Sequence, residues 1–178
     1  MIPLPTLAQS LHEVATALEA HTPDEQANWM HGLAKKEMVR LYEWGGPVPL
    51  SHFADDSSGI VVHEGQNSLL PGFDRFEKHM VLRNGVIQGY NKQFFGWFTG
   101  PGHFTLKEQD GTAVFDYTTV AADAPAEWPT IRGNTGFPDT LVYGHMVDVM
   151  HRVSERITVG KAFKKGKEVG AYFMLLKR

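Results

Sequence analysis

Two short β-type runs meet at an Asn-Gly pair in residues 80–88, which read Met80-Val81-Leu82-Arg83-Asn84-Gly85-Val86-Ile87-Gln88. Asn and Gly tolerate the positive φ angles of a type I′ turn, whose backbone twist matches that of two antiparallel strands. This stretch is the strongest hairpin signal in the chain, and it predicts two strands joined by a two-residue turn. We therefore expect an antiparallel β-structure around it.

Similar β-type runs lie on both sides of this hairpin. Asp110-Gly111 predicts a second tight turn, between runs at 103–107 and 112–120. Five more β-type runs, at 59–63, 94–98, 141–152, 156–163 and 169–177, bring the total to nine, from which we expect seven to eight strands in hairpin order. Hairpin order favours an up-and-down barrel, and about eight strands enclose an interior filled by side chains or by one small ligand.

Two helices are expected before the strands. The first follows an apolar stripe with helical spacing, formed by Leu7, Leu11, Val14 and Leu18. The second begins at Thr22-Pro23-Asp24-Glu25, where Thr22 caps, Pro23 suits the first helical position and Glu25 completes a capping box. Its stripe continues through Met30, Leu33, Ala34, Met38 and Leu41 and ends at Gly45-Gly46-Pro47.

These patterns predict an α+β fold that is mostly antiparallel β: a lipocalin-like (calycin-type) β-barrel preceded by two N-terminal helices. We expect a single domain over 1–178, with a helical segment at 1–46 and the barrel at 58–178. Residues 141–152 fit a helix as well as a strand, because their apolar residues also have helical spacing. A helix there would give the alternative, a cone-shaped fold in which helices pack on a curved sheet.

Composition excludes several classes of protein. The chain has 178 residues and no cysteine, which excludes a disulfide scaffold, a thiolate nucleophile and a cysteine-ligated metal. Residues 1–5 contain no basic segment and no long apolar run, so we expect no signal peptide, no membrane partner and a cytoplasmic location. The net charge of −3 is small, and the lysines at 161–167 suit a solvated β-turn, so no nucleic-acid partner is expected.

Metal and phosphate motifs are also missing. The nine histidines include no HExxH pattern, and His145 and His151, six residues apart, do not have ligand spacing on a strand or a helix. Gly100-Pro101-Gly102 precedes a β-type run instead of a helix, so it predicts a tight turn and no phosphate loop. We therefore predict neither a metal site nor a cofactor.

Aromatic side chains are concentrated in the middle of the chain. Seven of them lie within 24 residues on predicted strands: Phe94, Phe95, Trp97, Phe98, Phe104, Phe115 and Tyr117. Apolar walls with a few polar groups form small-molecule pockets, although a plain aromatic core would have the same composition. The leading hypothesis is a barrel that binds a small, largely apolar molecule. Its walls would be Tyr90, Trp97, Phe104 and Tyr117, and His103, His145 and Asp148 would orient the ligand.

An enzyme is the alternative. A carboxylate beside a histidine can orient it as a general base, so His145 with Asp148 would serve a cofactor-free cyclase, isomerase or dehydratase in the same cavity. The plainer interpretation is that Asp148 forms a structural ion pair with Arg152, four residues away.

Both faces of 141–152 are apolar, which indicates burial under the helices or against a second subunit, and we expect a homodimer.

The C-terminal third also carries a pattern of spaced residues: Tyr143, Asp148, Arg152 and Gly160, followed by Tyr172-Phe173-Met174-Leu175-Leu176-Lys177-Arg178. With these residues the chain resembles the bacterial GXWXG proteins and their companion C-terminal domain of unknown function. The naming motif is partly present in Tyr42-Glu43-Trp44-Gly45-Gly46, where Tyr42 replaces the first glycine. The resemblance implies a lipocalin-like barrel and carries no catalytic residue to this chain.

Overall fold

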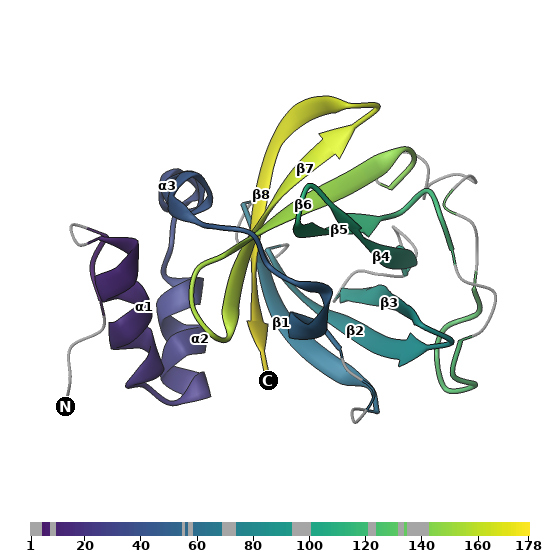
Figure 1. The fold of residues 1–178 in the computed structure, drawn as a ribbon, viewed down its shortest axis with the longest axis horizontal. Coiled ribbons are helices and arrows are strands. Elements are labelled where there is room, and N and C mark those ends of the chain that lie inside the picture. Colours follow the sequence, from purple (N-terminus) through teal and green to yellow (C-terminus); the bar gives the residue numbers. More distant parts are fainter. Residues whose placement is uncertain are drawn as a thin grey trace.

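A computed structural model describes residues 5–7, 10–54, 56, 59–68, 74–93, 101–120, 124–131, 134 and 143–178 of the chain. Within these residues, three α-helices precede eight β-strands that close into one antiparallel barrel (Figure 1). The helices are α1 (Leu11–Glu19), α2 (Pro23–His31) and α3 (Lys35–Trp44), followed by a short 3-10 helix, η1 (Leu50–His52). The strands are β1 (Val61–Asn67), β2 (Arg75–Arg83), β3 (Val86–Gln93), β4 (Phe104–Gln109), β5 (Thr112–Asp116), β6 (Met146–Arg152), β7 (Ile157–Lys164) and β8 (Lys167–Lys177).

Each strand pairs with the next one along the chain, and β8 pairs with β1 to close the barrel. Closure pairs the first strand with the last and so removes the two free edges of an open sheet, which are the usual sites of edge-to-edge association. The predicted mostly β, antiparallel barrel is therefore confirmed. Residues 146–152 form a strand, so the alternative of a curved open sheet with a helix at this position is wrong.

Three hairpins use the same turn chemistry. Both central residues have positive φ at Asn84-Gly85 (51° and 75°), at Asp110-Gly111 (52° and 79°) and at Lys165-Gly166 (52° and 73°). The first two turns are the ones predicted from the sequence, and they connect the predicted strand pairs. The third lies within the lysine-rich segment, where Lys165 and Lys167 are exposed.

The prediction of two N-terminal helices is wrong, because the second predicted helix is divided into α2 and α3. Gly32 ends α2, and its backbone N–H donates to the carbonyl of Trp29 at 3.1 Å. Ala34 then has extended backbone angles, and its N–H donates to the Glu37 side chain at 2.7 Å, which starts α3. A single apolar stripe runs through both helices because both pack on the same surface. The stripe therefore concealed the break.

The barrel wall separates two apolar cores. Alternate residues of a strand point to opposite faces, so β8 contributes Phe173 and Leu175 to the inner core and Met174 and Leu176 to the outer one. On the outer face, Val159 and Met174 pack against helical residues such as Leu18 and Met30, and Figure 1 shows the helices gathered beside the barrel. The inner core contains Phe104, Phe115 and Leu175 with their neighbours. Of the described helices, none is long and apolar enough to cross a membrane.

Three glycines on the inner face sit opposite phenylalanines of the neighbouring strand. The pairs are Gly65 with Phe76, Gly89 with Phe104 and Gly160 with Phe173. A Cβ atom at Gly65 would lie 2.5 Å from Phe76 Cζ, and one at Gly89 would lie 2.6 Å from Phe104 Cζ. Each ring therefore occupies the space that the glycine side chain leaves. The centroids of all three rings lie 4.6–5.5 Å from the amino group of Lys78.

Candidate ligand-binding cavity

Polar side chains occupy interior positions on four walls of the barrel. Lys78 on β2 and Asn91 on β3 are paired directly in register, so both point to the same face of the sheet. Asp148 on β6 is paired with Phe115 of β5, and Tyr117 follows Phe115 by two residues. All four polar side chains are buried, with exposed fractions of 1–4%. Burying this much polarity in a barrel is costly unless the groups are paired.

Lys78 lies at the centre of this group. Its Nζ donates to Asn91 Oδ1 at 2.7 Å and to the Tyr117 hydroxyl at 2.6 Å. Five aromatic rings have their centroids within 4.5–5.5 Å of Nζ: Phe76, Phe104, Phe115, Tyr117 and Phe173. The faces of aromatic rings attract a cation, so this cage partly replaces the water that Lys78 loses.

The charge of Asp148, which lines the same cavity, acts on Lys78, but the described residues include no ion pair between the two side chains. Burial raises the pKa of the Asp148 carboxyl to about 6, while the charge of Lys78 and a hydrogen bond with Tyr117 oppose the rise. Burial likewise lowers the pKa of Lys78 to about 7, against the charge of Asp148. Burial also raises the pKa of Tyr117 well above its ordinary value. The site thus pairs an acid and a base whose pKa values both lie near neutrality.

One acceptor of this pair is unused. Asp148 Oδ1 is buried and has no hydrogen-bond partner among the described residues. A buried carboxylate oxygen without a partner costs free energy, so it is usually satisfied by water or by a ligand. Asp148 Oδ1 is therefore an acceptor that water or the donor group of a ligand would satisfy.

A cavity of about 140 Å³ adjoins these groups. Lys78, Asn91, Tyr117 and Asp148 line it together with the rings of Phe76 and Phe173. A cavity of about 150 Å³ holds a benzene molecule in another protein. This pocket, which is open to solvent, therefore has room for a benzene-sized molecule next to the acid–base pair.

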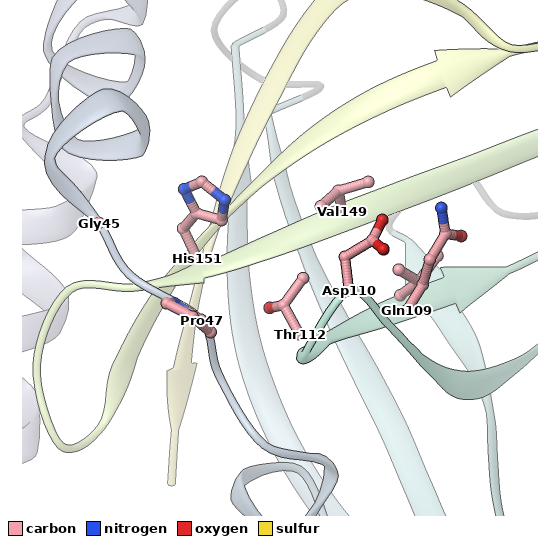
Figure 2. Close-up of a pocket in the computed structure, with 8 residues that line it drawn as sticks. Gly45, Pro47, Gln109, Asp110, Thr112, Val149 and His151 are labelled. Atoms are coloured by element: carbon pink, nitrogen blue, oxygen red, sulfur yellow. The ribbon is translucent and has the colours of Figure 1, made fainter.

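A second hollow lies on the outside of the barrel, between the segment that follows α3 and the turn between β4 and β5 (Figure 2). Its volume is about 240 Å³, but the Thr112 hydroxyl and the His151 ring that line it already form hydrogen bonds within the protein. The Thr112 hydroxyl accepts from Val48 N–H and donates to the Met150 carbonyl. The His151 ring stacks on Tyr42 at 4.0 Å and bonds its carbonyl oxygen through Nδ1. These contacts attach α3 to the barrel, so the interior cavity is the better candidate site.

The structure divides the predicted site residues between several places. Phe104, Tyr117 and Asp148 face the interior. Tyr90 and His103 contact each other outside the barrel, and Tyr90 packs edge-on against Trp128 at 5.1 Å. The space beside Trp128 is only about 10 Å³, enough for at most one water molecule. Trp97 lies outside the described residues.

The predicted histidine–aspartate pair is not assembled. His145 is exposed in the turn before β6, where its φ is 58°, whereas Asp148 faces the cavity. The predicted ion pair of Asp148 with Arg152 is also absent among the described residues, since Arg152 Nε donates to the Ser154 carbonyl at 3.3 Å. On a strand, four residues span about 13 Å, which is too far for an ion pair.

Sequence reasoning missed Lys78. A signal was nevertheless present, because Phe76, Lys78, Met80 and Leu82 alternate on one face of β2. A single lysine on an otherwise apolar face has to be accommodated in the interior.

Comparisons with protein-family models, with curated proteins and with solved structures found no match to this chain. The resemblance to the GXWXG proteins therefore stays a prediction, as do the homodimer and the cytoplasmic location. The function has to be argued from the cavity itself.

Proposed function

We propose that the protein is a lipocalin-like barrel that binds a small, largely apolar molecule in its interior cavity. The observation that carries the proposal is the buried Asp148 Oδ1, which has no partner among the described residues and lies in a cavity lined by aromatic rings as well as by polar side chains. The rings suit the apolar body of the ligand, and Asp148 suits a hydroxyl or another donor at one end. The cavity volume limits the ligand to about the size of a substituted benzene.

Benzyl alcohol is a suitable probe, because it has an apolar ring and one hydroxyl donor. We expect it to bind more tightly than toluene, which lacks the donor, and to shift the amide resonances of β2, β3 and β6 in a nitrogen–proton correlation spectrum. The variant Ala162→Leu tests the location. Ala162 is buried, pairs with Asp148 in register and lines the cavity, so a leucine there would fill the space.

Ala20→Leu is the matched control, because Ala20 is exposed at the end of α1. We expect Ala162→Leu to abolish the shifts and Ala20→Leu to preserve them. Equal binding by both variants, or shifts scattered over the outer surface, would refute interior binding.

A cofactor-free isomerase, cyclase or dehydratase is the second candidate, and one observation favours it. Asp148 and Lys78 have pKa values of about 6 and 7, the range suited to general acid–base catalysis at neutral pH. In this enzyme hypothesis Lys78 has the role of general base that the sequence assigned to His145. Turnover of a benzene-sized substrate that is lost in Asp148→Asn, with binding retained, would support it.

A further inference from the structure

The two hydrogen bonds of the Lys78 amino group can be formed by a neutral amine as well as by an ammonium ion. An ammonium nitrogen has three N–H donors, and a neutral amine has two donors and a lone pair. Asn91 Oδ1 and the Tyr117 hydroxyl accept two of them, at 2.7 and 2.6 Å. The third tetrahedral position is then available for the lone pair when Lys78 loses its proton.

The surroundings make that loss feasible near neutral pH. Lys78 is 1% exposed, and desolvation lowers its pKa to about 7. Burial therefore raises the share of neutral amine at neutral pH above that of an ordinary lysine, which is deprotonated to less than about one part in a thousand. Asp148, the natural acceptor of the proton, lines the same cavity.

We propose that Lys78 condenses with the carbonyl group of a benzene-sized aldehyde or ketone in the cavity and forms a Schiff base. This inference rests on the proposed binding function and names the chemical class of its ligand. Buried lysines are nucleophilic because burial favours the neutral amine. The five rings around Nζ leave Lys78 only 1% exposed, which limits the contact with water that would otherwise favour hydrolysis of the product.

The reaction needs no oxidant, reductant or further reactant. The Nζ lone pair forms a bond to the carbonyl carbon, and the carbonyl oxygen takes a proton from the Asp148 carboxylic acid. The resulting carboxylate removes a proton from nitrogen, which gives the neutral carbinolamine. Asp148 then protonates the hydroxyl group, the C–O bond breaks and one water molecule leaves. The product is an iminium ion next to the Asp148 carboxylate.

Exposed lysines provide an internal comparison. Lys92 and Lys107 are 60% and 51% exposed, and each forms an ion pair with a carboxylate, Glu77 and Asp116 respectively. Ion pairing and hydration favour the ammonium form, which is not nucleophilic. The proposal therefore predicts selective reaction at Lys78 although Lys78 is the most buried of the three.

The test is reductive trapping of the folded protein with benzaldehyde. The protein is incubated with benzaldehyde near pH 7, reduced with cyanoborohydride, digested and analysed by mass spectrometry for lysines that carry a benzyl group. Among the lysines we expect one benzyl group, at Lys78, added at least about tenfold faster than at any other lysine; labelling of the α-amino group, which has a low ordinary pKa, is counted separately. Lys78→Arg should remove this product, and Lys92→Arg should leave it unchanged.

The outcomes separate this inference from the proposed function. Binding of benzyl alcohol without a benzylated Lys78 would overturn the Schiff base and leave ligand binding intact. Benzylation of the surface lysines at the same rate as Lys78 would also overturn it. Absence of both binding and trapping would overturn both proposals. The position of the benzyl group on the chain without substitutions tests the Schiff-base proposal even if Lys78→Arg does not fold.

Discussion

Replacement of Lys78 by methionine gives the sharpest test of the physical argument for the site. Methionine has a similar length and no charge, so Lys78→Met removes the proton equilibrium while keeping most of the volume. Lys78 has a pKa of about 7 in the folded chain and an ordinary value of 10.5. Between these two pH values the unfolded chain binds more protons than the folded chain. Stability should therefore rise with pH in this window.

The size of the effect follows from the same two values. The gap between 7 and 10.5 corresponds to roughly 5 kcal/mol of stability over the whole window. Integrating the difference in bound protons from pH 7 to pH 9 gives about 2 kcal/mol of that total. We expect the free energy of unfolding of the unmodified chain, minus that of Lys78→Met, to increase by this amount.

Urea unfolding followed by tryptophan fluorescence at pH 7, 8 and 9 measures this difference. Asp148 also titrates, so the same comparison is made in an Asp148→Asn background, where the increase should persist because no carboxylate then stabilises the ammonium ion. A difference that stays constant from pH 7 to pH 9 in both backgrounds would refute the reasoning. It would mean that Lys78 remains an ammonium ion, and the free-amine chemistry would lose its basis.

Three other predictions concern the framework of the site. Gly160→Ala should destabilise the fold by about 1–3 kcal/mol in urea unfolding, because its Cβ would overlap the Phe173 ring, whereas Gly59→Ala, with no atom within 4 Å, should be neutral. Equal effects at the two glycines would contradict the packing argument. His63 is fully buried and desolvation lowers its pKa to about 3, so stability present above pH 6.5 should be lost as the pH falls. About 2 kcal/mol of that loss should occur between pH 7 and pH 5, and His63→Leu should not show it. Thr22→Ala removes the side-chain acceptor for Glu25 N–H at 3.3 Å and should cost about 1 kcal/mol, measured as a lower Tm.

The parts of the fold that are governed by local chemistry could be predicted from the sequence. Asn84-Gly85 and Asp110-Gly111 select a turn through the φ angles of two residues, and that preference is independent of the rest of the chain. The capping box of Thr22 and Glu25 is local in the same way. Hairpin order then followed from the short distances along the sequence between the strands.

Side-chain direction could not be predicted equally well. Tyr90 and Asn91 are neighbours in β3, and only the pairing register with β2 decides that Asn91 points inward and Tyr90 outward. A shift of one residue would exchange them. For this reason Tyr90, and with it His103, was expected at the site and is found in a separate outer cluster.

By itself, then, the sequence determined the hairpins, the helix caps and the mostly antiparallel β-structure, because each depends on residues a few positions apart. The tertiary structure alone decided the site. Lys78, Asn91, Tyr117 and Asp148 come from segments up to 70 residues apart and meet only because β8 closes on β1 and encloses one interior. Their shifted pKa values have the same origin, since desolvation acts on a side chain only when other parts of the chain remove it from water.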